Sequence, residues 1–313
     1  MRVFLSGGTG VLGRRVIKLL VDGGYQVVGL SRSQANTDWL IQHGAEPRQG
    51  DLFNQEEINH LTSDCEAVLH LATAIPTKLR TKSADWSMND RIRREGTRVM
   101  LGAALHNHCD LFLQQSIISI YGEHGGKWVD ESIPVATHPS SILQSAVDME
   151  QMIQDAITDH KAPAVILRFG SFYSHDSAQT SAMFQMTKKG TFPILGNGRF
   201  YWNLISADDA ARAVFHAVEN HSKIVGQTIN VCDDLPILNR DLLTYMADIL
   251  EVRKPFRIPL LLAKLLLGSD IIKAISASFR CRNNLAKENL NWQPQFQTYR
   301  EGFRVEIEKW QGV

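Results

Sequence analysis

The stretch RVFLSGGTGVLGRRVIKLL, residues 2–20, decides the fold. It begins with the apolar run Val3–Leu5, which is rich in β-forming residues and predicts a buried strand. Three glycines follow at regular spacing, and after them apolar side chains recur at helical spacing. A helix is therefore expected to begin inside the glycine motif. A strand, a glycine-rich turn and a helix in this order are typical of a dinucleotide-binding fold.

Each glycine has its own physical role in such a turn. Gly7 lacks the Cβ that would obstruct a tight turn, Gly10 lets the backbone approach a phosphate, and Gly13 lets the helix pack on its strand. The N–H groups at the start of the helix favour a bound pyrophosphate. An ordinary strand-to-helix turn is the alternative, which the sequence context disfavours. The turn residues expected to contact the cofactor are Gly7, Thr9, Gly10, Val11, Leu12 and Gly13.

Composition excludes several classes of protein. The 313 residues include 33 basic and 33 acidic side chains, a balance that argues against a nucleic-acid-binding protein. The four cysteines are far apart and form no CxxC pair, so we expect buried reduced thiols and no metal site. Met1 directly precedes the first strand, which leaves no room for a signal peptide. The apolar run Leu260–Leu267 is too short for a membrane span, which needs about 20 residues. We therefore expect a soluble, cytoplasmic protein.

The end of the second expected strand, Gln26–Leu30, indicates which dinucleotide is bound. An acidic residue at that place binds the ribose 2′-hydroxyl of NAD, whereas an arginine suits the 2′-phosphate of NADP. The sequence has Ser31 and Arg32 there, and no acid. We expect both residues to contact the cofactor, and we favour NADP, with NAD as the alternative. A surface arginine beside a turn would also explain Arg32.

Two later strand ends are also expected to reach the cofactor, because ligands of such sheets bind at the carboxyl ends of the strands. After the third expected strand, residues 46–49, the candidates are Asp51 and Leu52, although Asp51 also suits the cap of the helix expected over residues 55–61. His70 lies within the fourth, apolar strand and is expected to be a core residue. The contacts expected at the end of that strand are Leu71, Ala72 and Thr73.

A long helix is expected over residues 84–106, with an apolar stripe toward the sheet. Arg91, Arg94 and Arg98 fall on the opposite face, where a solvated charged surface is favoured over a phosphate site.

The fifth expected strand, residues 110–115, continues into SIISIYG, residues 116–122. Ser116, Ser119 and Tyr121 lie at or just after its end, so they are candidates for polarising a substrate. We prefer Ser116 and Tyr121 as the catalytic pair. A packed aromatic at the corner of the strand is the alternative for Tyr121.

The segment from residue 171 to residue 203 is polar and rich in aromatic residues. Such a segment is typical of a substrate pocket with apolar walls and a few polar groups, and Tyr173, Trp202 and Asn203 are expected to line it. The alternative, that these aromatics fill the core of a smaller domain, stays open. Two later helices are expected over residues 239–250 and 259–275, the second packed on that domain.

Together these motifs resemble the short-chain dehydrogenase/reductase superfamily, and within it the NAD(P)-dependent epimerase/dehydratase family. The resemblance spans nearly the whole chain, in the order of the glycine motif, GDL at 50–52, HLA at 70–72, SIISIYG at 116–122, LRFGSFY at 167–173, ISADDAA at 205–211, Asn283, and NWQP at 291–294. It implies a Rossmann-type α/β fold, a doubly wound parallel sheet with a small C-terminal α/β substrate domain. The NAD(P)-binding domain would comprise residues 1–170, with residues 203–232 returning to it. Residues 171–202 and 233–313 would form the substrate-binding domain.

The sequence departs from the superfamily at its acid–base pair. The superfamily uses a Tyr with a Lys four residues later, since the Lys and the cofactor's charge lower the Tyr pKa. When the corresponding helix is aligned on Glu150, Ile142 and Ala146 occupy these two positions. None of the six tyrosines has a Lys four residues later, so no other alignment restores the pair. The superfamily's usual Ser is also replaced, by Ile117. Alcohol–ketone chemistry by the usual pair is therefore in doubt.

Three functions are compatible with these residues. The first is an atypical NADP-dependent oxidoreductase acting on a small organic substrate, to which the cofactor supplies a hydride. The second is a nucleotide-sugar epimerase or dehydratase, which needs an activated base that the sequence does not show. The third is a non-catalytic NADP(H)-binding sensor. We favour the first function, and we include a homodimer among the possible assemblies because symmetric dimers are common.

Overall fold

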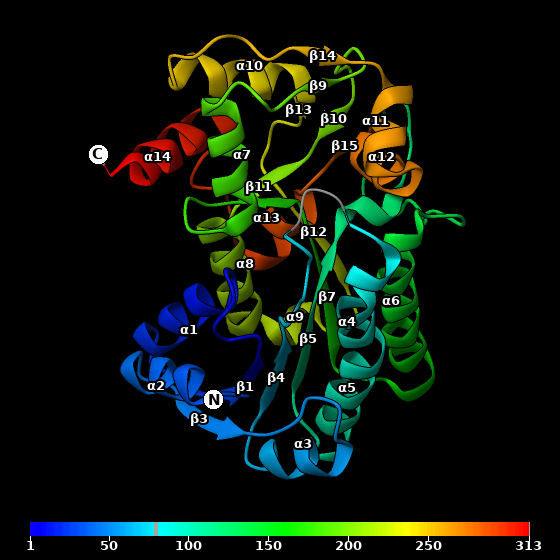
Figure 1. Ribbon diagram of the computed structural model, residues 1–313. Helices are drawn as coiled ribbons and strands as arrows, with labels where there is room; N and C mark the ends of the chain where they lie inside the picture. The colour runs from blue at the N-terminus through cyan, green and yellow to red at the C-terminus, as the bar shows by residue number, and fades with distance from the viewer. Residues whose placement is uncertain (78–80, 313) are drawn as a thin grey trace.

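A seven-stranded parallel sheet forms the centre of the molecule (Figure 1). The computed structural model describes residues 1–77 and 81–312; residues 78–80, within the expected NAD(P)-binding domain, and residue 313 lie outside the described part. The strand order reverses between β4 and β1, which opens a crevice at the carboxyl ends of the strands. In spatial order the strands are β12 (Thr228–Val231), β7 (Ala164–Phe169), β5 (Leu111–Ile117), β4 (Ala67–His70), β1 (Arg2–Ser6), β2 (Gln26–Ser31) and β3 (Glu46–Gln49).

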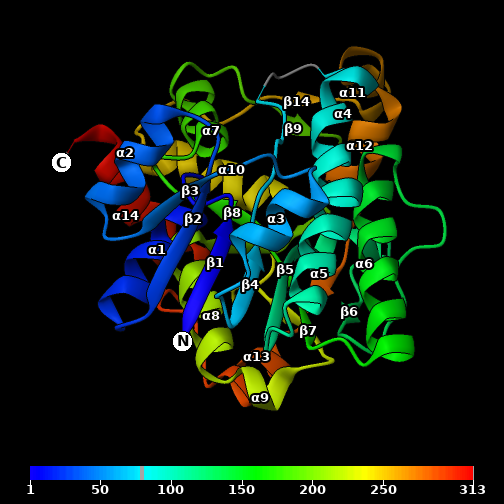
Figure 2. The ribbon, with the colours of Figure 1, turned by 90° about the horizontal axis from the view of Figure 1, so that it is seen from below.

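Helices cover both faces of this sheet, and Figure 2 shows the two layers from below. One layer consists of α1 (Gly13–Asp22), α2 (Gln34–Gln42), α8 (Ala207–Glu219), α9 (His221–Ile224) and α13 (Asn284–Leu290). The other consists of α3 (Gln55–Leu61), α5 (Thr97–His106) and α6 (Ser141–His160). Each layer buries its own apolar core against one face of the strands, as the alternation of strands and helices requires. The predicted doubly wound Rossmann-type fold is confirmed.

The helix expected over residues 84–106 contains an irregular turn. It begins as α4 (Ser83–Arg91), passes through the π-helical turn η1 (Ile92–Gly96) and continues as α5. Arg91 and Arg94 are exposed and form ion pairs with Glu95 and Asp148, as expected for a solvated face. Single π-helical turns inside α-helices occur frequently at functional sites.

A second apolar core lies beyond the carboxyl ends of the sheet strands, in the upper part of Figure 1. Its elements are β8 (Ser171–Tyr173), α7 (Ala178–Lys188), β9 (Ile194–Leu195), β11 (Leu204–Ser206), β13 (Ile237–Leu238), α10 (Asn239–Ile249) and α14 (Tyr299–Gln311). Shorter elements flank it: η2 (Ile118–Tyr121), β6 (Trp128–Val129), β10 (Tyr201–Trp202), β14 (Arg257–Ile258) and β15 (Arg280–Cys281). Residues 204–206 form the expected strand, β11, which pairs with β8, and β12 joins the central sheet. The return of residues 203–232 to the NAD(P)-binding domain stays a prediction.

The single helix expected over residues 259–275 is divided in two. Gly268 has a φ of +97°, which few other residues adopt, and it separates α11 (Leu260–Leu267) from α12 (Ser269–Ser276). The first part packs on this region through a small contact: Ala263, its buried residue, lies in a cluster with Leu195 and Phe200. The rest of α11 is open to solvent, and Leu261 is 82% exposed. Among the described residues, no helix has the length and apolar character needed to cross a membrane. The four cysteines are free and buried, as expected.

Candidate functional site

A cavity of about 720 Å³ lies at the carboxyl ends of the central strands. Its lining comes from segments far apart in the sequence: the glycine turn, the ends of β2, β4 and β5, the π-helical turn, and the region around β8, β10 and β11. One continuous space therefore connects the expected cofactor site with the expected substrate pocket.

The glycine turn has the geometry expected of a phosphate-binding turn. Gly7 has a φ of +81°, and a Cβ on it would lie 2.6 Å from the backbone N of Ala72. A Cβ on Gly13 would clash with the Gly7 carbonyl oxygen. Helix α1 starts without a side-chain cap and has no acidic residue in its first turn. The N–H groups of Leu12 and Gly13 make no backbone hydrogen bond within the described part of the chain, so they are available to an anion. These residues fit a dinucleotide pyrophosphate.

The adenosine side of the cavity includes Arg32, which follows β2. Its neighbour Ser31 is fully buried and does not line the cavity, because its hydroxyl bonds to Thr37 and donates to the carbonyl oxygen of Ser33. Asp51 is exposed and also lies outside the lining; its Oδ1 accepts the N–H of Phe53. The cap of α3 is Asn54 rather than Asp51. The other cofactor residues predicted from the sequence all line the cavity: Gly7, Thr9, Gly10, Val11, Leu12, Gly13, Arg32, Leu52, Leu71, Ala72 and Thr73.

His70 is a core residue, as expected. It is fully buried at the end of β4, where Nδ1 lies 2.6 Å from the hydroxyl of Ser6 and Nε2 lies 3.3 Å from the carbonyl oxygen of Ile92. Burial lowers the pKa of His70 to about 4. The imidazole is therefore neutral at pH 7 and links two strand ends that border the cavity.

The three residues predicted for the substrate pocket line the same cavity. The indole N–H of Trp202 donates to the carbonyl oxygen of Ile275 at 3.0 Å. The side-chain N–H of Asn203 donates to the Phe279 carbonyl oxygen at 3.0 Å, and its Oδ1 accepts the backbone N–H of Cys281 at 2.7 Å. The Tyr173 hydroxyl donates to Asp233 at 3.3 Å and lies beside Gly302 of α14. The hydroxyl is therefore bonded within the protein, and the ring is the part of Tyr173 that lines the cavity.

The preferred catalytic pair, Ser116 and Tyr121, does not reach the cavity. Side chains alternate along a strand, and on β5 Gln115 and Ile117 line the cavity, so Ser116 points away from it. The Ser116 hydroxyl instead donates to Glu150 on α6. Tyr121 is buried against Phe279 and lies outside the lining. Of the three residues considered at this strand end, only Ser119 lines the cavity.

Ser116 and Tyr121 belong to a buried polar network beneath the cavity. Arg168 forms an ion pair of 2.6 Å with Glu150, and its Nη1 donates to the Tyr121 hydroxyl at 2.8 Å. That hydroxyl donates to Asn230 at 3.0 Å. Burial raises the pKa of Tyr121, which is the opposite of what a catalytic acid–base tyrosine requires. The network connects β5, β7, β12 and α6 and serves packing.

Arg93 was not recognised from the sequence, although it lines the cavity. It lies in the π-helical turn, 7% exposed, and Nη1 donates to the Ser145 hydroxyl and the Ile142 carbonyl oxygen of α6 at 3.3 and 3.4 Å. A signal was present, because Arg93 lies next to Ile92 and three residues before Gly96, on the apolar side of the helix. The charged lining residues, within the described part of the chain, are Arg32 and Arg93.

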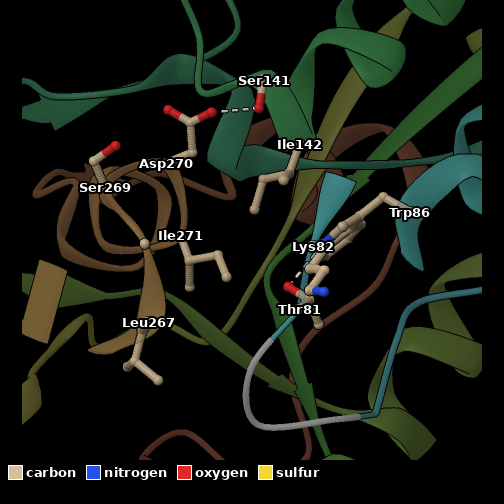
Figure 3. Close-up of a pocket in the computed structure, with 10 residues that line it drawn as sticks. Thr81, Lys82, Trp86, Ser141, Ile142, Leu267, Ser269, Asp270 and Ile271 are labelled. Atoms are coloured by element: carbon tan, nitrogen blue, oxygen red, sulfur yellow. Dashed lines mark hydrogen bonds between the residues drawn. The ribbon is translucent and has the colours of Figure 1, made fainter. Parts of the chain in front are cut away.

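The helix that would carry the superfamily's acid–base pair presents apolar side chains instead. Ala146 is fully buried, and Leu143 lines the main cavity. Ile142 faces a smaller cavity of about 330 Å³, shown in Figure 3. There Ser141 donates to Asp270 of α12 at 2.5 Å, and the Trp86 indole donates to Thr81 at 3.0 Å. Trp86 lines both cavities.

The family model that matches this chain covers residues 3–232 and describes the NAD-dependent epimerase/dehydratase family. The chain belongs to that family, and the predicted membership is confirmed. Binding of an NAD(P) dinucleotide is thus expected from both the family and the glycine turn.

Individual relatives have different activities. A 3-diazoavenalumate denitrifying reductase from a Streptomyces species is 24% identical over 314 residues, which cover 96% of this chain and 99% of that protein. Among solved structures, a UDP-glucose 4-epimerase from Thermotoga maritima with UDP-glucose has a TM-score of 0.82 at 19% identity, covering 100% of this chain and 99% of the other. A UDP-glucuronic acid 4-epimerase from Bacillus cereus, in complex with NAD, has a TM-score of 0.79 at 20% identity, with coverage of 100% and 99%. At such identities the solved structures establish the fold alone.

Proposed function

We propose that this chain is an NADP(H)-dependent reductase that acts on a small organic substrate. The observation that carries the proposal is that the larger cavity is continuous. It extends from the glycine turn and Arg32 to Tyr173, Trp202 and Asn203. It has space for a dinucleotide at one end and apolar walls with a few polar groups at the other, as enzyme pockets for small molecules have.

The preference for NADP rests on Arg32. The residue directly follows the second strand of the sheet, at the place where the adenosine ribose of a dinucleotide lies in this fold. Its planar guanidinium suits a 2′-phosphate, and no acidic residue stands beside it at the end of that strand. When bound, NADPH supplies the hydride.

We infer the direction of reduction from the relative named as a reductase, and the groups that line the cavity indicate which proton transfers the chain supports. Oxidising an alcohol or epimerising a sugar requires a base that removes a hydroxyl proton. Within the described residues, no Asp, Glu, His or Lys side chain lines the cavity. In a reduction, negative charge would develop on the heteroatom that accepts the electron pair. Ser119, which lines the cavity, would donate a hydrogen bond to that atom, and a proton from solvent would complete the product. The relative named as a reductase, which matches over 96% of this chain, supports the same direction.

Consumption of NADPH at 340 nm, with a panel of small aromatic aldehydes, ketones and unsaturated acids, tests this function. We expect turnover with at least one class of compound. Ser119→Ala should lower kcat by about tenfold or more, because a donor to the developing charge is lost. Its matched control, Ser116→Ala, should keep kcat within about twofold and lower the melting temperature instead. Tight NADPH binding without turnover on any compound would favour the sensor function.

A further inference from the structure

Arg93 is a buried cation with too few partners. Within the described part of the chain, its guanidinium makes hydrogen bonds only through Nη1, at the long distances of 3.3 and 3.4 Å. It forms no ion pair there, since the carboxylate of Asp90 accepts the Ser145 hydroxyl at 2.6 Å instead. Buried charged groups are normally paired, because leaving an unpaired charge out of water is costly.

The charge of Arg93 persists at neutral pH. Burial lowers the pKa of the guanidinium to about 10, and the nearby Asp90 opposes this shift. The remaining donors, Nε and Nη2, have no hydrogen-bond partner among the described residues, and the side chain borders the cavity. Two donors of a planar fork are therefore available to a ligand in that space.

The position of Arg93 separates it from the cofactor's phosphates. Arg93 contacts α6, which connects β5 with β7, whereas Arg32 follows β2. In the sheet order, β5 and β2 lie on opposite sides of the β4–β1 pair, beside which the glycine turn lies. The pyrophosphate and the ribose phosphate thus have their own sites, and Arg93 faces the other half of the cavity. Its neighbours in the lining there include Trp86, Ile92 and Leu143, which are apolar.

We propose that Arg93 binds a carboxylate on the substrate, so that the substrate class is small carboxylic acids with an apolar body. This inference rests on the proposed reductase function. The guanidinium fork matches the two oxygens of a carboxylate, and the hydrogen bonds are strengthened by charge in a partly desolvated site. The carboxylate supplies the counter-charge that the protein does not provide, and the apolar neighbours contact the rest of the molecule. Arg93 acts as a substrate-binding residue that positions the reducible group.

Calorimetric titration of the NADP⁺-saturated protein with trans-cinnamate and with its neutral amide tests this inference. We expect the carboxylate to bind about tenfold more tightly than the amide, or better. Arg93→Gln should remove that preference while leaving the affinity for NADPH within about twofold. Arg98→Ala, which removes an exposed arginine of α5, is the matched control and should change neither affinity.

The outcomes separate this inference from the proposed function. If the wild-type protein binds no NADP(H), the proposed function fails. If it binds NADPH but takes cinnamate no better than the amide, or if Arg93→Gln keeps the preference, the inference about Arg93 is overturned. A large loss of NADPH affinity in a folded Arg93→Gln protein would also overturn it. Should that variant not fold, Arg93→Lys keeps the charge and loses the fork, and it should bind cinnamate several-fold less tightly than the wild type.

Discussion

Arg32 and Arg93 lie in two halves of the same cavity, and they differ in burial. Arg32 is exposed at the end of β2, whereas Arg93 is 7% exposed inside the helix. Arg32 was recognised from the sequence, because its distance from the glycine motif is fixed by the fold. Arg93 had a signal in its spacing from Ile92 and Gly96, but sequence periodicity does not indicate the π-helical turn in which it lies.

Replacing Arg32 tests the choice of dinucleotide. Arg32→Ala should weaken NADPH binding by about tenfold or more, because a charge-assisted contact with the 2′-phosphate is lost. NADH lacks that phosphate, so its affinity should change by no more than about twofold. Calorimetric titration measures both, with Arg98→Ala as the control. Equal losses for the two dinucleotides would refute the assignment of Arg32.

Replacing Tyr121 distinguishes packing from catalysis. Tyr121→Phe leaves a buried donor of Arg168 and the acceptor of Asn230 without their partner, which should cost about 1–3 kcal/mol in the free energy of unfolding. NADPH affinity should not change. Urea unfolding measures the loss, and Tyr245→Phe, at a surface contact with the Arg300 carbonyl oxygen, is the control with a smaller effect. Lower turnover with undiminished stability would return Tyr121 to the catalytic candidates.

The position of Ser116, outside the cavity lining, shows the limit of sequence patterns at the scale of one residue. The sequence located the end of the fifth strand, and that end does border the cavity. It did not fix the strand's last residue: β5 extends to Ile117, two residues past the expected end at Gln115. Neighbouring side chains on a strand point to opposite faces, so the position of Ser116 depended on that detail. Ser119 lies after the strand, in η2, where alternation does not apply.

At the scale of elements, the sequence predicted β1, α1, α3 and α10 because each has a strong local signal. Helix α3 begins and ends where it was expected, at Gln55 and Leu61. The pairing of β11 with β8 has no such signal, since only the packing of the second core decides it. Likewise, a glycine inside an apolar run was not enough to predict the break between α11 and α12 at Gly268.

The contact between α14 and β8 supports one wall of the cavity. A Cβ on Gly302 would clash with the Tyr173 hydroxyl, so Gly302→Ala should push the helix or the tyrosine out of place. We expect a loss of about 1–3 kcal/mol in the free energy of unfolding. Glu301→Ala, at the exposed neighbouring position, should change it by less than about 0.5 kcal/mol. If urea unfolding finds the two variants equally stable, Gly302 does not lie as close to the Tyr173 hydroxyl as described.

At the scale of the whole molecule, Asp233 lies where the central sheet meets the second core. It follows β12, is 3% exposed, and its Oδ1 has no hydrogen-bond partner among the described residues. Burial, and then the charge of Asp209, raise the pKa of Asp233 well above its usual value. The folded protein therefore keeps a proton that the unfolded chain releases above pH ~4.

This retained proton sets a direction for the dependence of stability on pH. A raised carboxyl pKa contributes stability that is complete below the unfolded pKa and is lost as the pH rises through the folded pKa. Asp233→Asn removes this dependence, so its melting temperature relative to the wild type should be higher at pH 8 than at pH 5. Asp110→Asn, at an exposed carboxyl, should show no such trend. A relative melting temperature that is lower at pH 8 would contradict the protonated, buried state of Asp233.

A side-by-side calorimetric titration of the wild-type protein with NADPH and NADH is the most direct test of dinucleotide binding in the cavity. We predict binding of both, with NADPH bound at least about tenfold more tightly through Arg32. If neither dinucleotide binds, the glycine turn has no cofactor, and the roles proposed for Arg32, Arg93 and Ser119 are wrong.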